Sequence, residues 1–381
     1  MILWFAQLTN AQIILDYSNS PSIEQCQTTD SFTTVKVKSL PTIEVGLNQV
    51  WDFSSASDSA NIVRKALPVS GNAGFPSATF KTEIFYSFSQ LRYDGTLMYN
   101  VTPDGIEQYG VHIDKQAIPL KGMTGGSKDS LIFIQQDVKY SSPGYEVKFP
   151  TTFGDKWTDS YSFKTHFNLT VALFGLDNVP GERRTLYTVD NEVVGWGQMI
   201  VNDKYGKPTK PIDVLMIKTT ETSIDSFYLA GAPAPAQLLG AFGLTQNQID
   251  RKYSYSFNRG GEHYGLAIIE YNDNSFNQPA LVAIHQLRLG ATNSIQNNML
   301  ISDISIFPNP VCNNTFHIKV NGLDDNYTYW IYDIVGKVVE LGKVNSNGVI
   351  NLEKNNPTGT YFIKLKSQSG NYSINQFQII R

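Results

Sequence analysis

The amino-acid sequence predicts an all-β protein, in which a large antiparallel β-sandwich body is followed by a small immunoglobulin-like β-sandwich. Short apolar or alternating runs follow one another from Ile13 onward, and alternation with a period of two is typical of half-buried strands. Dipeptides rich in Gly, Pro, Asn and Asp separate these runs, and such dipeptides supply the backbone angles of hairpin turns. Almost no segment has the period of an amphipathic helix.

The strand pattern is strongest in six segments of the body. Residues 161–171 alternate between polar and apolar side chains, and residues 252–257 place three aromatic rings on one face. Short helical turns are expected only at residues 234–242 and 246–250. These features predict a sandwich of antiparallel sheets. Four further strands are expected at residues 33–38, 83–88, 97–101 and 130–135.

Bulk properties exclude several classes of protein. A chain of 381 residues is long enough for two or three domains. The formal net charge of −4 argues against nucleic acid as a partner, because binding phosphates requires a basic surface. No run of about 18 apolar residues follows the first few positions, so no transmembrane helix is expected. Cys26 and Cys312 lack C-x-x-C partners, which argues against a zinc or redox site.

The amino-terminal residues resemble the end of a secretory signal peptide. Residues 2–6 form a short apolar run, and a small residue, Ala11, precedes Gln12. We therefore expect residues 1–11 to be a truncated signal peptide that is cleaved after Ala11. A first β-strand is the alternative interpretation.

The composition changes near residue 290. Residues 291–299 are polar, rich in Asn and aperiodic, which is typical of a linker. We expect a body over residues 12–290, a linker over 291–303 and a second domain over 304–381. Turn signals recur about every 8–12 residues in that domain, as in a small immunoglobulin-like sandwich. Its strands are expected at residues 315–320, 327–333, 337–341, 348–352, 361–366 and 373–380.

Three short motifs follow one another within residues 304–381. Pro308 and Pro310 cannot extend a sheet ladder, so they are expected to end the first strand. Gly336 is expected in the left-handed conformation of a tight turn. The motif residues are Phe307, Pro308, Asn309 and Pro310 in the first, Asp333, Gly336 and Lys337 in the second, and Gly359 and Tyr361 in the third.

These motifs and their order resemble the type A C-terminal sorting domain of proteins exported by the type IX secretion system of Bacteroidota. The resemblance implies export across the outer membrane. It also implies that residues 304–381 are recognised by outer-membrane secretion and attachment machinery, and that the protein is secreted or attached to the cell surface. One position departs from the family pattern, because Gln378 stands where a lysine is usual, although Arg381 keeps a terminal positive charge.

The body has a fainter resemblance. Residues 46–54 and 149–159, together with residues 197–200 and 213–218, are similar to segments of uncharacterised secreted proteins that carry the same tail. That group has no established activity. This resemblance therefore implies a fold and a compartment only.

The body contains no nucleophile elbow, zinc-protease helix, phosphate-binding loop or EF-hand pattern. Asp155 and Asp159 flank Trp157, and Glu262 precedes His263, but glycoside hydrolysis requires two facing carboxyl groups about 5–10 Å apart. These carboxylates are therefore expected to be solvated turn residues. Four histidines stand singly on strand-like runs, where surface or half-buried positions are expected: His112, His166, His263 and His285.

Two further patterns have a structural and a functional interpretation. Residues 271–277 are rich in side-chain oxygens that suit calcium, but Asp273 is their only carboxylate, so an Asx-rich loop is favoured. Aromatic residues can stack on sugars, but Trp51, Trp157 and Trp196 are expected in the core. The sequence thus predicts a non-catalytic glycan- or protein-binding body, without catalytic, metal or cofactor-binding residues and without cofactors. An extracellular hydrolase with an unrecognised site is the alternative.

Overall fold

The structure, a computed structural model, describes residues 13–21, 29–69, 74–88, 90–203, 205–285, 304–320, 326–334, 336–352, 356–367 and 372–381. These residues fall into two compact units, the body up to residue 285 and the carboxyl-terminal unit from residue 304. The expected signal peptide, Cys26 and the expected linker lie outside the described residues. Both units consist of mainly antiparallel sheets, which confirms the all-β class.

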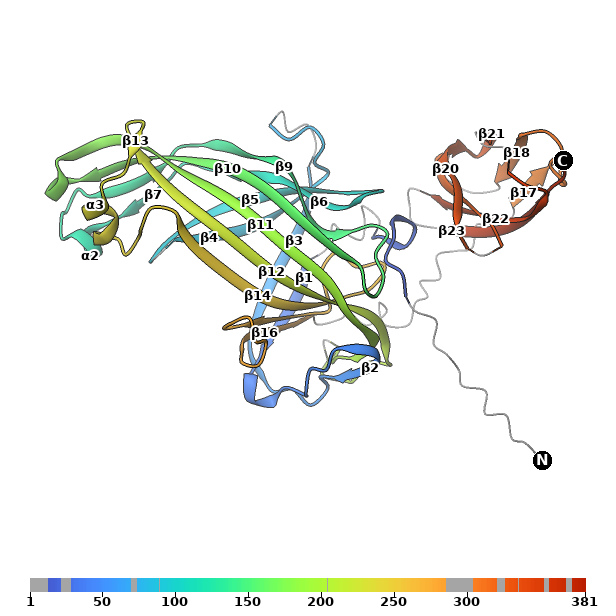
Figure 1. Ribbon diagram of the computed structural model, residues 1–381, viewed down its shortest axis with the longest axis horizontal. Coiled ribbons are helices and arrows are strands. Elements are labelled where there is room, and N and C mark those ends of the chain that lie inside the picture. Colours follow the sequence, from blue (N-terminus) through green and yellow to red (C-terminus); the bar gives the residue numbers. More distant parts are fainter. Residues whose placement is uncertain are drawn as a thin grey trace. The chain divides into compact units, whose positions relative to one another are not determined.

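In its described residues, the body forms a single 16-stranded sheet with two short α-helices and three 3-10 helices (Figure 1). The α-helices are α2 (Lys121–Thr124) and α3 (Ala236–Ala241). The strands are β1 (Thr29–Val35), β2 (Gly46–Asp52), β3 (Asp58–Pro68), β4 (Phe80–Phe88), β5 (Leu91–Thr102), β6 (Gly105–Ile113), β7 (Gln116–Pro119), β8 (Ser130–Phe133), β9 (Gln136–Lys148), β10 (Lys156–Val171), β11 (Leu176–Ile200), β12 (Ile212–Leu229), β13 (Ala232–Pro233), β14 (Gln248–Asn258), β15 (Ala267–Tyr271) and β16 (Pro279–His285).

The sheet folds over so that its two halves face each other. The strand order is β7-β8-β10-β11-β12-β14-β15-β16-β1-β3-β4-β5-β6-β9, with β13 beside β12 and β2 beside β11. The last strand, β9, returns to β10. There the Ser142 hydroxyl donates to the carbonyl of Ser160 at 2.8 Å, and Ser162 N–H donates to the Ser141 hydroxyl at 2.9 Å.

Both faces of the folded sheet bury aromatic side chains. On the inner face, where the halves meet, Tyr161 of β10 stacks on Tyr140 of β9 with ring centroids 4.5 Å apart. On the outer face, Trp51 of β2 packs edge-on against Phe257 of β14 at 5.0 Å. The alternation along β10 therefore reflects one buried and one exposed face, whereas the first part of β12 is buried on both faces and is continuously apolar.

Two local expectations are wrong. The sequence predicts one strand over residues 33–38, but β1 ends at Val35 and Val37–Ser39 form a 3-10 helix. It predicts a helical turn over residues 246–250, but β14 begins at Gln248, because its backbone pairs with β12. Tertiary pairing here overrides weak local propensity. The helical turn expected at residues 234–242 is confirmed by α3.

Three of the body segments that resemble other secreted proteins meet in the fold, namely residues 46–54, 197–200 and 213–218. β2 pairs in parallel with the end of β11, where Trp51 lies opposite Met199. The other edge of β11 pairs with β12, where Met199 lies opposite Ile212. One outer-face cluster buries these side chains together with Val214.

The carboxyl-terminal unit packs two small sheets around one apolar cluster. The first has the order β17-β18-β21 and the second β20-β19-β22-β23. Apart from β17, which precedes them, these strands agree with the expected ranges to within a few residues. Their bounds are β17 (Ile304–Phe307), β18 (Thr315–Val320), β19 (Asn326–Tyr332), β20 (Val338–Asn345), β21 (Asn347–Asn351), β22 (Gly359–Ser367) and β23 (Tyr372–Ile379).

Among the described residues, no helix has the length and apolar character that crossing a membrane requires.

Candidate functional site

The first motif connects the start of the carboxyl-terminal unit to its last residues. β17 ends at Phe307, and residues 308–310 follow in an exposed loop, as expected of prolines that end a strand. The side-chain oxygen of Asn309 accepts a hydrogen bond from Gln378 N–H at 2.9 Å. A loop at the start of the unit is thereby fixed to β23.

Val311 extends this connection through the backbone. Its N–H donates to the carbonyl of Gln378 at 2.7 Å, and its carbonyl accepts from Ile380 N–H at 3.0 Å. The family pattern has lysine where this chain has Gln378. Because these contacts use only the backbone of residue 378, either side chain is compatible with them.

Asp333 organises the second motif. Its carboxylate accepts a hydrogen bond from Lys337 N–H at 2.9 Å, and its own N–H donates to the carbonyl of Lys337 at 3.0 Å. Gly336 has a φ of 83°, so the expected left-handed conformation is confirmed. The turn leaves the side chains of Ile334 and Lys337 exposed.

The third motif places a buried tyrosine near the second motif. Gly359 opens β22 and pairs with Ile379 of β23. Tyr361 is only 5% exposed. Burial raises the pKa of Tyr361, the Asp333 carboxylate raises this pKa further, and the Arg381 guanidinium lowers it. Both charged groups therefore lie close to this ring.

The three motifs and the end of the chain thus meet at one end of the carboxyl-terminal unit. Arg381 closes the arrangement, because its N–H donates to the Thr358 hydroxyl at 2.9 Å and its Nε to the carbonyl of Asn356 at 3.1 Å. The sequence predicted the motifs but missed the part that Gln378 and Arg381 play. We call this surface the sorting edge, and it comprises Phe307, Pro308, Asn309, Pro310, Asp333, Gly336, Lys337, Gly359, Tyr361, Gln378 and Arg381.

In the body, His112 of β6 forms a histidine–carboxylate pair. Its Nδ1 lies 2.6 Å from Asp137, and its Nε2 lies 3.4 Å from Asp114. The hydrogen bond to Asp137 raises the pKa of His112, partial burial lowers it, and Asp114 adds to the rise. Since each ring nitrogen faces a carboxylate, neither is available as a general base.

This pair makes stability depend on pH. A histidine with a raised folded pKa stabilises the fold fully below its ordinary pKa near 6.5, and this contribution disappears as the pH rises through the folded pKa. We expect His112→Asn to cost about 0.2–1 kcal/mol near pH 5.5, as for exposed ion pairs, and almost nothing near pH 9. Thermal unfolding at both pH values measures this. A cost that does not change with pH, or one that persists when Asp137 and Asp114 are both replaced by Asn, contradicts it.

The other histidines have different surroundings. His263 stacks on Tyr99, with ring centroids 4.4 Å apart, and His166 is exposed with its Nδ1 3.8 Å from Glu182. These two occupy the expected half-buried and surface positions. His285 does not: it is only 3% exposed and stacks on the ring of Phe32, so the expectation of a half-buried or surface position is wrong there.

The carboxylates on either side of Trp157 differ from each other. Asp155 is a turn residue, as expected, and accepts a hydrogen bond from Thr152 N–H at 2.8 Å. Asp159 is not, since it lies within β10 and is only 5% exposed. Burial raises the pKa of Asp159, while Lys148, 4.0 Å away, lowers it. Asp159 faces inward because it lies within the long alternating strand, so the expectation of a solvated turn residue is wrong for Asp159.

Glu262 and Asp273 are held by local contacts. Glu262 forms an ion pair with Arg259. Asp273 accepts a hydrogen bond from Ser275 N–H at 2.9 Å, and the hydrogen bonds from Ser275 lower the pKa of Asp273. The Asx-rich loop interpretation of residues 271–277 accounts for this geometry.

The expected core tryptophans pack in two clusters. Trp51 is 1% exposed on the outer face, and Trp196 is 8% exposed on the inner face. Trp157 is partly buried and packs against the cluster of Trp196. The expected core position is therefore confirmed for Trp51 and Trp196, whereas Trp157 lies at the margin of the core.

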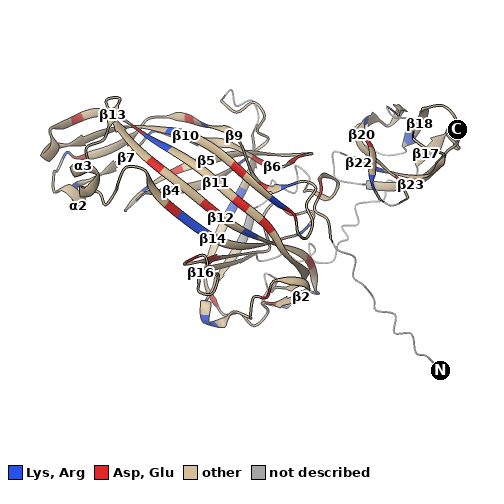
Figure 2. Ribbon diagram, viewed as in Figure 1, with Lys and Arg blue, Asp and Glu red and all other residues tan. Residues whose placement is uncertain are grey.

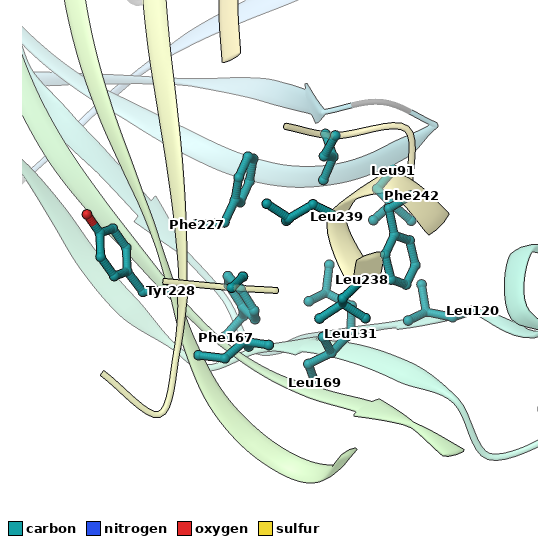
Figure 3. Close-up of a pocket in the computed structure, with 13 residues that line it drawn as sticks. Leu91, Leu120, Leu131, Phe167, Leu169, Phe227, Tyr228, Leu238, Leu239 and Phe242 are labelled. Atoms are coloured by element: carbon teal, nitrogen blue, oxygen red, sulfur yellow. The ribbon is translucent and has the colours of Figure 1, made fainter. Parts of the chain in front are cut away.

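An apolar hollow lies between α3 and the inner face (Figure 3). Leucine and phenylalanine side chains of β5, β8, β10 and β12, among them Phe227, face Leu238 and Leu239 of α3. The hollow measures about 40 Å³, whereas an engineered cavity that binds benzene in another protein measures about 150 Å³. Its size is that of a packing void, not of a ligand site.

The inner face of β12 changes character along its length. Its ends are apolar, with Leu229 and Phe227 in one core cluster and Leu215 and Ile217 in another. Between them lie inward-facing polar residues, which the register with β11 places on the same face: Thr219, Glu221, Ser223 and Asp225. A polar band inside a sheet that is otherwise apolar requires partners or water.

Asp225 has a buried cation as its partner. It receives two hydrogen bonds from Arg183 of β11, at 2.8 and 2.6 Å, and one from the Thr185 hydroxyl at 2.6 Å. Both ionic side chains are at most 10% exposed. Burial lowers the pKa of Arg183, but the hydrogen bond and charge of Asp225 outweigh burial and raise it.

Glu221 lies in the exposed part of the band. It pairs with Lys252 of β14 at 3.2 Å, and the side chains are 30% and 63% exposed. Partial burial lowers the pKa of Lys252, but the charges of Glu221, Asp250 and Glu270 outweigh it and raise this pKa. Register places all four side chains on the inner face, and Figure 2 shows the charged residues along β12 and β14. We call Glu221, Lys252, Asp250 and Glu270 the inner charged cluster.

Comparison with curated proteins finds no match to this chain. Residues 305–380 match the secretion system C-terminal sorting domain. The match spans the strands that carry the sorting edge, and it implies type IX export and an extracellular or cell-surface location. It therefore supports a type IX sorting tail at the carboxyl end of this chain.

Proposed function

We propose that this chain is an exported protein whose body binds a glycan or a surface protein outside the cell without acting as an enzyme. The sorting edge is the surface that the outer-membrane secretion and attachment machinery recognises. The proposed organisation is a signal peptide over residues 1–11, the body over 12–290, a linker over 291–303 and an immunoglobulin-like sorting domain over 304–381. The source organism belongs to the Bacteroidota.

The convergence of the three motifs supports the sorting role. Asn309, Asp333 and Tyr361 lie far apart in the sequence; Asn309 bonds to Gln378, and the charges of Asp333 and Arg381 both act on Tyr361. The motif turn and the proline loop are exposed, so a partner protein can contact them without unfolding the sandwich. The stability of the sandwich does not require these two segments to be exposed on its surface.

The inner charged cluster supports the binding role of the body. Lys252, Asp250 and Glu270 are exposed although they lie on the inner face, next to apolar core. Charged side chains beside apolar core offer a ligand both polar and apolar groups, the combination that binding sites use. This is the single observation that favours binding.

Hydrolysis is the second candidate, and one pair of carboxylates favours it. Glu146 of β9 accepts a hydrogen bond from the Gln108 amide at 2.9 Å. Desolvation raises the pKa of Glu146, the charge of Arg64 lowers this pKa, and the charge of Glu221 raises it further. Two carboxylates in unlike surroundings are the usual basis of acid–base catalysis.

An array experiment tests the body. The purified full chain is incubated with immobilised glycans and with surface proteins, and we expect saturable binding to at least one of them without any change in the bound molecule. Shortened products, absent with Glu146→Gln, would establish the hydrolase instead. Failure to bind on both arrays contradicts the binding role.

A further inference from the structure

We propose that the body binds an extended basic peptide segment of another protein along the unpaired edge of β14, beside the inner charged cluster. This inference rests on the proposed binding function and names its ligand class. An extended peptide can add a strand to an exposed sheet edge, where backbone hydrogen bonds supply affinity and alternate side chains supply specificity.

The edge of β14 is open over half of the strand. β14 pairs with β12 along Gln248–Asn258, but β15 covers its other edge only along 253–257. Among the residues that the structure describes, no further segment pairs with Gln248, Ile249, Asp250, Arg251 or Lys252 on that side. The backbone groups of these residues are therefore placed to pair with an added strand.

The side chains beside this edge select for positive charge. Glu221, Asp250 and Glu270 outnumber the one cation among them, Lys252. A basic side chain that points to the inner face would meet two carboxylates in excess, whereas an acidic one would be repelled. Charge complementarity thus favours a lysine- or arginine-bearing segment.

The outer face of the edge presents Ile249 and the cation Arg251, which favours apolar over basic side chains there. Ile249 lies on the outer face and is 52% exposed. Because successive residues of a strand point to opposite faces, a bound segment would alternate basic and apolar side chains. Such a segment would place its basic residues over Asp250 and Glu270 and its apolar residues over Ile249.

Competing features of this edge are weaker explanations. Charged residues on an edge strand also discourage aggregation, and Arg251 and Lys252 fit that role. That role does not account for carboxylates gathered on β12 and β15 as well as on β14, all on the inner face. Electrostatic recognition of a basic segment accounts both for the charges on β14 and for the carboxylates on β12 and β15.

The test uses the full chain and a fluorescent Lys-Val-Lys-Val-Lys peptide, with Glu-Val-Glu-Val-Glu as the matched acidic probe. We expect anisotropy to report binding of the basic probe only, weakening with added salt. The double variant Asp250→Asn/Glu270→Gln should weaken binding about tenfold, the effect of two exposed ion pairs. Asp190→Asn, which removes a carboxylate from the outer face of the same sheet, should leave binding unchanged.

Hydrogen exchange locates the bound peptide. The amides of residues 248–252 should exchange more slowly when the basic probe is bound. Binding that the double variant does not weaken, or protection elsewhere in the body, overturns the site but leaves the binding function standing. Failure of the basic probe to bind, with a glycan bound on the array, overturns the ligand class; failure of every probe overturns both.

Discussion

Deletion of residues 304–381 will retain the body inside cells that carry the type IX secretion system. The deletion removes the whole segment that matches the sorting domain, while the body keeps its own sheet and its own core clusters. Fractionation with an antibody against the body measures the surface and medium fractions, and we expect both to fall to background. A body that reaches the surface without this segment would contradict the sorting role.

Point variants separate the sorting edge from the stability of its domain. Lys337→Ala changes an exposed residue of the edge, and Asn309→Ala removes the acceptor of the Gln378 amide. We expect both to lower the exported fraction without loss of the folded protein. Lys343→Ala, which changes an exposed lysine of β20 outside the edge, is the matched control. Equal export of all three variants would remove the edge from the recognition surface.

The carboxyl-terminal unit could be predicted well because its strands are short and local turn residues separate them. The positive φ of Gly336 and the end of β17 before Pro308 followed from backbone chemistry alone. The place of Arg381 beside Tyr361 did not, because contacts between the first and last segments depend on how the two sheets pack. The sequence motifs identified the residues of the sorting edge, but their positions relative to one another depend on how the two sheets pack.

The body was predictable in class but not in its site. Alternation indicated strands, yet both faces of β12 and β14 are used, so the pattern could not separate inward from outward residues. The polar run of residues 218–226 between two apolar runs was the signal that was missed. It looks like an exposed strand in the sequence, whereas Asp225 is buried against Arg183 and Glu221 lies partly exposed on the inner face.

Asp225→Ala will destabilise the body by about 3–5 kcal/mol, the usual cost of leaving one charge of a buried pair without its partner. The Arg183 guanidinium donates two hydrogen bonds to Asp225 and lies within 3.5 Å of the Tyr93 hydroxyl. Urea unfolding followed by tryptophan fluorescence measures the loss, since Trp51 and Trp196 are buried in the body.

The double variant Arg183→Met/Asp225→Leu distinguishes a buried charge from lost packing. Apolar side chains of similar size remove both charges, and such replacements are often neutral or stabilising, so most of the loss should be recovered. If the double variant is as unstable as Asp225→Ala, the cost lies in packing against Thr185 and Tyr93 instead. If the ion pair contributes little to stability, its role is to specify the strand register, because it joins β11 to β12 where the polar band begins. A one-residue slip between these strands would turn Asp225 to the opposite face and leave Arg183 buried without its partner, which disfavours the shifted pairing.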